Sequence, residues 1–480
     1  MSNNKCKKTL TTILAFGLVV SQLIGCTAKE TVKIDVMEAE KSNAVSFDII
    51  GGKDVMPIGA FYGPYVCGYS EDGQSAPNYM EEYYWQAMAD CGINVMLQTQ
   101  LDYSISPSLV RDALEMGEKY NIGICVTDNT VRTMGEDGSE IDIEKLSTRL
   151  SEYVTHPAFA GLYLQDEPYT SEFEPVASQP ERNLYIRENI AKALHNDIDT
   201  FTYVNLLSSG LQKESFPIYE EYVRECVKTL KPKYLLYDRY VFDAVQKDYV
   251  DRYFYDMAIM RKVSQENGIP FWTFIQCGSQ WNDAQDHFDS DGYYPLEGQF
   301  DWNVNTSLAF GAQGFSYFMF IQPYYFAYAK SQAFDFERNG LIGAWGNKNR
   351  WWYYAQDITK QIRAVDEVLM NSVNKGVLAC GEQATKDLKL TKDYDVLLEG
   401  TSWRELKNVS GEALVGCFNY QGKTALYVVN YDTEYAQKIN LEFQDSYQVK
   451  VVQDGETRNV KGDGMTLDLL AGGAALLVFE

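Results

Sequence analysis

Gly161-Leu162-Tyr163-Leu164-Gln165-Asp166-Glu167-Pro168 is the stretch from which the rest of the chain can be interpreted. Its apolar first half predicts a short strand, and that strand ends abruptly in two carboxylates and a proline. Burying charge beside a hydrophobic core is costly in free energy, so two carboxylates are not expected at the end of a strand that has only a structural role. The stretch therefore indicates a functional site at the C-terminal end of a strand.

The same unit, a short apolar run followed by a longer amphipathic segment, can be counted eight times from about Ile50 onward. Gly92, Gly123 and Gly268 each fall between a helix pattern and the next strand, where a left-handed residue lets the chain turn back. The expected strands are Ile58–Tyr62, Ile93–Gln98, Ile124–Thr127, Gly161–Gln165, Phe201–Leu206, Tyr234–Tyr237, Phe271–Gln276 and Gly314–Phe320. Eight strands joined by helices predict a (β/α)8 TIM barrel, because parallel strands need helical crossovers and right-handed crossovers close the sheet.

A doubly wound open sheet is the competing α/β architecture. The segment after the first expected strand, Gly59-Ala60-Phe61-Tyr62-Gly63-Pro64, contains neither a GxGxxG pattern nor the lysine of a phosphate-binding loop. Such a sheet usually carries one of these at its first turn, so the barrel is favoured.

The first 26 residues have the form of a secretory signal. Three lysines at positions 5, 7 and 8 precede an apolar run over Leu10–Val20 and then Leu23-Ile24-Gly25-Cys26. This ending resembles a bacterial lipobox, which implies removal of residues 1–25 and a diacylglycerol on Cys26. The protein would then be anchored by lipid at the extracytoplasmic face of the cell membrane. A transmembrane anchor is disfavoured, because spanning a bilayer takes roughly 20 apolar residues.

The pattern changes after an expected helix over Arg350–Asn371. Short alternating runs separated by turn signals predict a small antiparallel β-sandwich; they are Ala413–Phe418, Thr424–Asn430, Ile439–Phe443, Tyr447–Val452 and Ala474–Phe479. We therefore divide the chain into a signal peptide (1–25), a lipid-anchored tether (26–46), a barrel (47–375) and a C-terminal β-sandwich (376–480).

Composition excludes several classes of partner. The formal net charge of −25 argues against nucleic acid, whose binding needs a cationic surface. The cysteines show no CxxC pair, and the three histidines, His156, His195 and His287, show no HExxH spacing. The sequence thus predicts buried free thiols and neither a metal nor a cofactor. The 35 tyrosines and 8 tryptophans suggest surfaces on which sugar rings can stack, although most of these rings belong to the core.

Asp166-Glu167-Pro168, at the end of the fourth of eight strands, resembles the Asn/Asp-Glu-Pro ending of that strand in a large clan of (β/α)8 glycoside hydrolases. The passage Ala309–Phe318 is similar to the entry into strand eight of β-galactosidase-like members. The resemblance implies a hydrolase acting on an oligosaccharide or glycan, with Glu167 as general acid/base. A glutamate on a partly apolar rim beside a second carboxylate should have a raised pKa, which suits an acid that protonates the departing oxygen.

The second catalytic group is not settled by the sequence. In that clan it is a Glu at the end of strand seven, whereas here Phe271–Cys277 contains no acid. Asp238, directly after strand six, is one substitute. Asp128, after strand three, is either a substrate-binding residue or a helix cap. Third, Asp166-Glu167 resembles the doublet of N-acetylhexosaminidases, in which the acetamide of the sugar attacks, the Asp orients it and the Glu is the acid.

The missing acid also keeps a non-enzymatic alternative open, namely a lipid-anchored carbohydrate-binding protein on a barrel that has lost catalysis. Strand-end aromatic and amide residues are the expected sugar contacts; together with Asp128 they are Tyr62, Gln98, Asn205, Trp272, Gln276 and Trp281. Strand alternation places Tyr163, Gln165 and Glu167 on one side and Leu162, Leu164 and Asp166 on the other. We therefore expect Glu167 to face the barrel mouth, and Asp166 to help only if the strand twists or ends before it.

Overall fold

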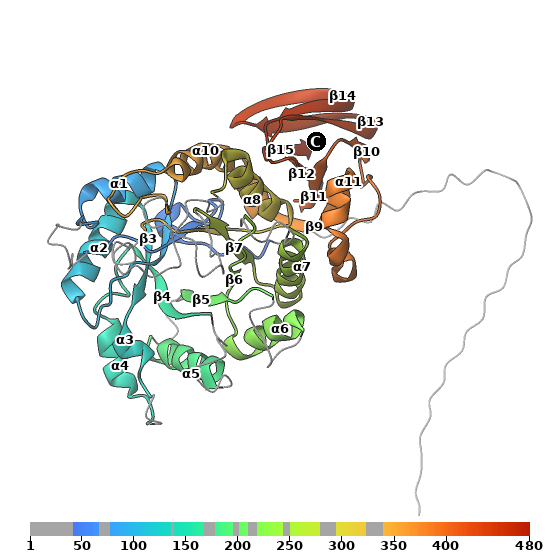
Figure 1. Ribbon diagram of the computed structural model, residues 1–480. Helices are drawn as coiled ribbons and strands as arrows, with labels where there is room; N and C mark the ends of the chain where they lie inside the picture. Colours follow the sequence, from blue (N-terminus) through green and yellow to red (C-terminus); the bar gives the residue numbers. More distant parts are fainter. Residues whose placement is uncertain are drawn as a thin grey trace, which may run out of the picture. The chain divides into compact units, whose positions relative to one another are not determined.

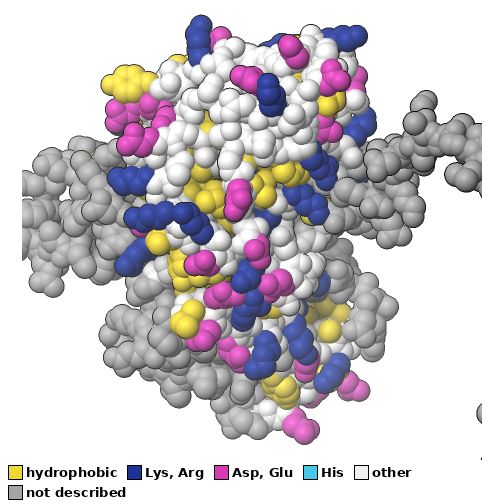
Figure 2. Space-filling model, turned by 90° about the vertical axis from the view of Figure 1, so that its right-hand side faces the viewer, with side chains coloured by type: hydrophobic (Ala, Val, Ile, Leu, Met, Phe, Trp, Pro, Cys, Tyr) yellow, Lys and Arg dark blue, Asp and Glu magenta, His cyan; other side chains and the backbone are white. Residues whose placement is uncertain are grey.

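The computed structural model describes residues 42–66, 77–135, 139–167, 178–194, 201–209, 218–242, 250–278, 294–322 and 339–480, with the backbone alone for residues 178–184 and 201. No helix within these ranges combines the length and the hydrophobicity that crossing a bilayer requires. On the face drawn in Figure 2, Lys and Arg side chains lie among Asp and Glu side chains. The acidity of the chain is therefore not gathered into a patch of one sign on that face.

Eight parallel strands close into a barrel, as the sequence predicts (Figure 1). Each strand pairs with the next one along the chain, and β8 pairs with β1 to close the sheet. The strands are β1 (Ile58–Phe61), β2 (Val95–Gln98), β3 (Gly123–Thr127), β4 (Phe159–Asp166), β5 (Phe201–Leu206), β6 (Leu235–Tyr237), β7 (Phe271–Gln276) and β8 (Phe315–Phe318). The closed sheet excludes the doubly wound alternative.

Helices connect the strands and surround them in Figure 1. They include α1 (Glu82–Asp90), α2 (Pro107–Tyr120), α3 (Asn129–Arg132), α4 (Ile143–Leu150), α5 (Ser178–Ala193), α6 (Tyr219–Leu230), α7 (Val250–Asn267), α8 (Glu297–Ala309) and α10 (Arg350–Met370). Gly92 and Gly268 take positive φ values of 88° and 64° at helix ends, as predicted. After α2 the left-handed residue is Asn121 (φ 56°), and Gly123 is already the first residue of β3.

The interior of the barrel is filled by aromatic side chains. Phe61 lies at the centre of this group, with ring centroids 6.0 Å from Tyr203 and Phe274 and 6.3 Å from Tyr163. Every residue of β1, β3 and β7 is buried, as expected for parallel strands covered on both faces. The inward-pointing side chains thus pack the barrel solidly beneath its mouth.

The N-terminal end of the barrel is covered by the beginning of the described chain. Phe47 is buried there, 6.4 Å from the ring of Trp272, which stands near the start of β7. Ser42 accepts a hydrogen bond from the amide of Gln313, just before β8. Ser42 to Phe47 therefore enter the barrel from the side opposite its mouth.

The C-terminal domain is a seven-stranded antiparallel sheet that bends into the predicted small β-sandwich. Its strands are β9 (Ser372–Cys380), β10 (Leu406–Ser410), β11 (Ala413–Tyr420), β12 (Lys423–Asn430), β13 (Gln437–Gln453), β14 (Glu456–Leu469) and β15 (Ala474–Phe479). The first half of β13 pairs with β10 and the second half with β15. A register irregularity between Glu442 and Tyr447 marks the bend, and Phe443 meets Phe479 across the core at 5.0 Å.

The sequence predicts two separate strands over residues 439–452, whereas the structure has the single strand β13. The polar residues at the bend resemble a turn in sequence, because the local pattern does not reveal that β14 continues to pair with β13 on both sides of the bend.

The sandwich packs directly against α8. Tyr427 on β12 donates its hydroxyl to Asn305 on α8 at 2.7 Å. At Gly416 of β11, a Cβ atom would stand only 2.4 Å from the carbonyl oxygen of Ala309, so only glycine allows this approach. The barrel and sandwich therefore share a continuous hydrophobic core.

Candidate active site

A β-bulge near the end of β4 sets the direction of Asp166. Tyr163 pairs with Tyr203, Gln165 with Val204, and Asp166 with Asn205, so Leu164 is an extra residue without a partner on β5. Tyr203 belongs to the interior cluster and Val204 to the core under the helices, so the next residue, Asn205, is again inward. The prediction that Asp166 points away from the barrel interior is therefore wrong, because alternation fails at the bulge.

Glu167 leaves the strand directly after Asp166. Its backbone takes φ 44°, and its N–H donates to the carbonyl oxygen of Asn205 at 3.0 Å. Burial and then the negative charge of Asp166 raise the pKa of Glu167 to about 7. A carboxyl group with that pKa holds its proton for a substantial part of the time near neutral pH.

Asp166 differs from Glu167 in its immediate partners. Solvent reaches the side chain of Asp166. The surrounding barrel wall nevertheless excludes much of the water around its carboxylate, and this desolvation raises its pKa to about 6. The amide of Asn205 and the hydroxyl of Tyr203 act in the opposite direction, because they favour the charged form. Asp166 is thus the carboxylate of this pair that ionises first.

Asp238 completes a group of three carboxylates. It follows β6, and its Oδ1 accepts a hydrogen bond of 3.1 Å from Asn205 Nδ2. Burial raises the pKa of Asp238 well above its ordinary value, and the charges of Glu167 and Asp166 raise it further. The ionised forms of Glu167 and Asp166 thus oppose the ionisation of Asp238, and the ionised form of Asp166 opposes that of Glu167. The sequence named all three residues, and the structure brings them together around Asn205.

Aromatic rings lie beside these carboxylates. Tyr62, a predicted sugar contact, is half-buried, with its ring 4.8 Å from Phe61 and 5.9 Å from Phe318. Tyr240 lies 5.5 Å from Phe318, and its pKa is raised by burial and then by the nearby charges of Asp238 and Glu167. Sequence reasoning missed Tyr240 and Phe318, although Tyr240 is two residues beyond Asp238 and Phe318 ends β8.

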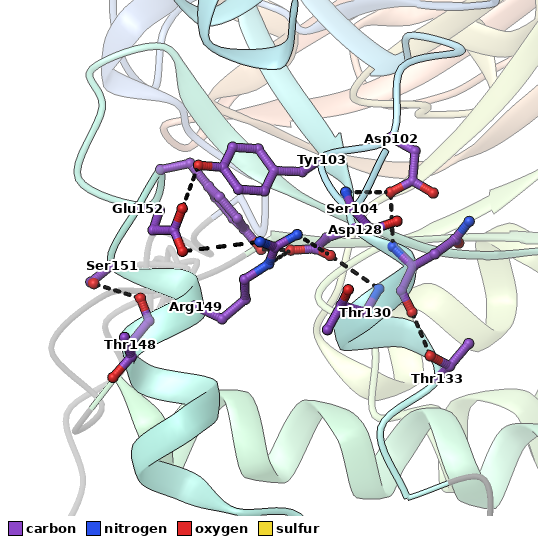
Figure 3. Close-up of polar contacts among 12 residues, drawn as sticks. Asp102, Tyr103, Ser104, Asp128, Thr130, Thr133, Thr148, Arg149, Ser151 and Glu152 are labelled. Carbon is purple, nitrogen blue, oxygen red and sulfur yellow. Dashed lines mark hydrogen bonds and ion pairs between the residues drawn. The ribbon is translucent and has the colours of Figure 1, made fainter. Parts of the chain in front are cut away.

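Asp128 has a structural role. Figure 3 shows its carboxylate facing Arg149, with which it forms an ion pair of 2.7 Å. Tyr153 donates a hydroxyl to it at 3.1 Å, and the backbone N–H of Thr130 donates at the start of α3. Its side chain is fully inaccessible to solvent. Asp128 is therefore a helix cap in a buried ion pair, and its prediction as a substrate-binding residue is wrong.

Trp272 and Gln276 are also withdrawn from the list of sugar contacts. Trp272 is fully buried near the N-terminal end of the barrel, with its ring 4.9 Å from Tyr234. Gln276 is buried at the end of β7, where its Oε1 accepts from Phe242 N at 3.0 Å and its Nε2 donates to Phe242 O and Gly278 O. The amide of Gln276 thus holds the segment after β6 against β7 and is not available to a substrate.

The remaining predicted residues are placed as follows. Gln98 is half-buried at the end of β2 and accepts hydrogen bonds from the backbone and side chain of Gln100. Trp281 and Cys26 lie outside the described residues. All six cysteines that the structure describes are buried and free. In the same part of the chain, no three His, Cys, Asp or Glu side chains are grouped so that they hold a metal ion.

No protein-family model matches the chain, and no curated protein matches it. Solved structures do. The chain superimposes on the β-galactosidase of Bacillus circulans sp. alkalophilus with a TM-score of 0.57 and 10% identity, over 88% of this chain and 99% of that one. Gan42B, a GH42 β-galactosidase, gives a TM-score of 0.53 and 9% identity, over 92% and 99%.

The β-galactosidase of the psychrophilic Marinomonas ef1 gives a TM-score of 0.43 and 11% identity, over 71% of this chain. The chain covers 65% of that enzyme's length, which is less than two thirds. At identities this low, the likeness to the first two enzymes establishes the fold. The chain therefore shares the overall fold of these two β-galactosidases.

Proposed function

We propose that the protein is a glycoside hydrolase in which Glu167 is the general acid/base and Asp166 is its ionised partner. The observation that supports this most is the group of three carboxylates around Asn205, in which Glu167 has a pKa of about 7. No Lys, Arg or His of the described residues forms an ion pair with Asp166 or Glu167. A carboxyl group that keeps its proton near neutrality suits acid catalysis.

In this mechanism Glu167 donates its proton to the glycosidic oxygen as the bond from that oxygen to the anomeric carbon breaks. The carboxylate of Asp166 stabilises the positive charge that develops on the sugar, either directly or by orienting an acetamide of the substrate. Glu167, now ionised, then takes a proton from the attacking water. Asp238, whose pKa is raised by burial and by the charges of Glu167 and Asp166, supports the pair through its hydrogen bond with Asn205. The rings of Tyr62, Tyr240 and Phe318 supply apolar contacts for the sugar.

The experiment is hydrolysis of a panel of aryl glycosides, including galactosides and N-acetylhexosaminides, by the mature protein and by Glu167→Gln. Glu118→Gln is the matched control, because Glu118 is an exposed glutamate on α2 whose neighbour is His156. We expect at least one glycoside to be cleaved by the wild type and the control and not by Glu167→Gln. Equal activity of all three proteins on that glycoside contradicts the assignment.

A carbohydrate-binding protein without catalysis is the second candidate, and Gln276 in place of an acid on β7 is the observation that favours it. The same panel separates the two functions. If no glycoside is cleaved while sugars bind to the mature protein, as measured by calorimetry, the binding function is supported and the hydrolase is not.

We also propose that Cys26 carries the lipid that anchors the protein to the outer face of the cell membrane. The basic, apolar and Leu-Ile-Gly-Cys segments of residues 5–26 support this proposal. Metabolic labelling with an alkyne fatty acid tests it. We expect label on the wild type and none on Cys26→Ser, and equal labelling of the two proteins contradicts lipidation at this residue.

A further inference from the structure

Leu164, the extra residue of the β4 bulge, has no paired residue on either neighbouring strand. On the β5 side the register passes from Tyr163 to Gln165, and on the β3 side the pairing ends at Tyr163. Leu164 is nevertheless buried, and a buried carbonyl group needs a donor. Arg132 supplies one, because its Nε donates to the Leu164 oxygen at 2.8 Å.

Arg132 is itself held in place from two directions. Its Nη1 donates to Asn129 Oδ1 at 2.8 Å, and its guanidinium lies 5.3 Å from the ring centre of Tyr163. Arg132 is therefore fixed both to its own helix, α3, and to the strand that carries the bulge.

Asp102 and Asp128, both drawn in Figure 3, anchor the short helix α3. Asp128 caps it through the N–H of Thr130 and is paired with Arg149. Asp102 Oδ1 accepts from the backbone N–H of Asn129 at 3.1 Å. The buried Asp128 ion pair, which takes no part in the carboxylate group, thus fixes the helix from which Arg132 reaches β4.

We propose that Arg132 is a positioning residue that holds the Leu164 bulge and thereby turns Asp166 into the barrel mouth beside Glu167. In a strand without the bulge, Asp166 would stand opposite Leu206, which is buried in the core beneath the helices. The catalytic role of the Asp166–Glu167 pair is the only part of this inference that rests on the proposed function. The placement of Asp166 can be tested without any substrate.

Removal of Arg132 has two opposing effects on the pKa of Glu167. Loss of its positive charge alone would raise the pKa of a nearby carboxyl group. Loss of the bulge would carry the charge of Asp166 away from Glu167, and this would lower the pKa of Glu167 from about 7 toward its ordinary 4.5. The other ionisable groups that interact with Glu167 are Asp238, Tyr163, Tyr222 and Tyr240. They belong to β4, α6 and the segment after β6, and a substitution on α3 leaves their chemistry unchanged.

The test is a ¹³C NMR titration of the Glu167 carboxyl in the full mature protein, with the signal assigned by its absence from Glu167→Gln. We expect Arg132→Met to lower the pKa of Glu167 by about one pH unit. Arg132→Lys, which can still donate to the Leu164 carbonyl, should keep the pKa of Glu167 close to its value in the wild type. Arg458→Met is the control, because Arg458 lies on β14 of the C-terminal domain, and it should change nothing.

An unchanged or raised pKa of Glu167 in folded Arg132→Met overturns the proposal. If that variant does not fold, Asn129→Ala takes its place, because it removes the hydrogen bond that orients the guanidinium and leaves the charge. We expect Asn129→Ala to give a smaller shift in the same downward direction, and an unshifted titration overturns the proposal. The result is independent of catalysis: an inactive wild type contradicts the hydrolase and leaves the titration unaffected.

Discussion

The ends of β3 and β4 are neighbours in the barrel, and each carries an aspartate in or directly after the strand. Asp128, after β3, is enclosed by Arg149, Tyr153 and the start of α3 and has no contact with solvent. Asp166, at the end of β4, is reached by solvent and is accompanied by two further carboxylates. A strand-end carboxylate thus becomes structural when a half-buried cation pairs with it, as in Asp128, whereas Asp166 lies beside other acids and stays accessible to solvent.

The largest effect on activity is expected at Glu167. Glu167→Gln should lower kcat/KM for a phenyl glycoside by about 1,000-fold, because general acid catalysis typically contributes factors of 100 to 10,000. For a 2,4-dinitrophenyl glycoside, whose leaving group needs no proton, the loss should be less than about tenfold. Steady-state kinetics on both substrates measure the difference. Equal losses on the two substrates would show that Glu167 does not act as the acid.

Asp128 should give the opposite result. Asp128→Asn removes the partner of a half-buried Arg149 and should lower the free energy of unfolding by about 3 kcal/mol, measured by urea denaturation. Its activity at low temperature, while it is folded, should fall far less than that of Glu167→Gln, because an asparagine still accepts from the N–H of Thr130 and keeps the cap of α3. Glu152→Gln is the control, because its exposed carboxylate is 4.0 Å from Arg149 and should contribute less than about 1 kcal/mol. Full stability of Asp128→Asn would contradict the structural role of the Asp128–Arg149 ion pair.

Gln276→Glu tests whether the end of β7 can carry the acid that the resemblance to glycoside hydrolases leads one to expect there. Gln276→Glu places a carboxylate against the carbonyl oxygens of Phe242 and Gly278, which lose their donor. We expect a destabilisation of about 2 kcal/mol and no increase in hydrolysis, since this side chain is buried. Gln98→Glu, half-buried at the end of β2, is the milder control. A stable and more active Gln276→Glu would show that β7 does reach the substrate.

The smallest effect concerns stability and pH. A carboxyl group whose pKa is higher in the folded state stabilises that state while it is protonated, and this stabilisation is lost as the pH rises from 4.5 to about 7 for Glu167. Glu167→Gln should therefore make the decrease in unfolding free energy over this range shallower, by about 1 kcal/mol after allowance for solvent screening. Urea titrations at pH 4.5 and 7.5 measure it. A steeper decrease in the variant contradicts a raised pKa.

The sequence was sufficient for the barrel because its signal is repeated and local. Each of the eight apolar runs forms a strand, and the terminal runs form the sandwich. The three carboxylates were also found locally, since each lies at or just beyond the end of a predicted strand.

The features that the sequence did not predict depend on residues that are distant in the chain and that the fold brings together. The bulge at Leu164 is sustained by Arg132, 32 residues earlier in the chain, so alternation gave Asp166 the wrong direction. Asp128 and Asp166 look alike in sequence, and the Arg149 that distinguishes them is 21 residues from Asp128. Likewise, nothing around Gln276 foretells that its amide will be occupied by Phe242.

We propose above all that Glu167 is an acid that must be protonated to act. The pH dependence of kcat/KM on a phenyl glycoside tests it most directly, because this quantity reports the essential groups of the free enzyme. We expect kcat/KM to fall as the pH rises through about 7, and this decline to be absent from the residual activity of Glu167→Gln. A profile that stays level from pH 6 to 9 in the wild type, or the same decline in Glu167→Gln, would contradict it.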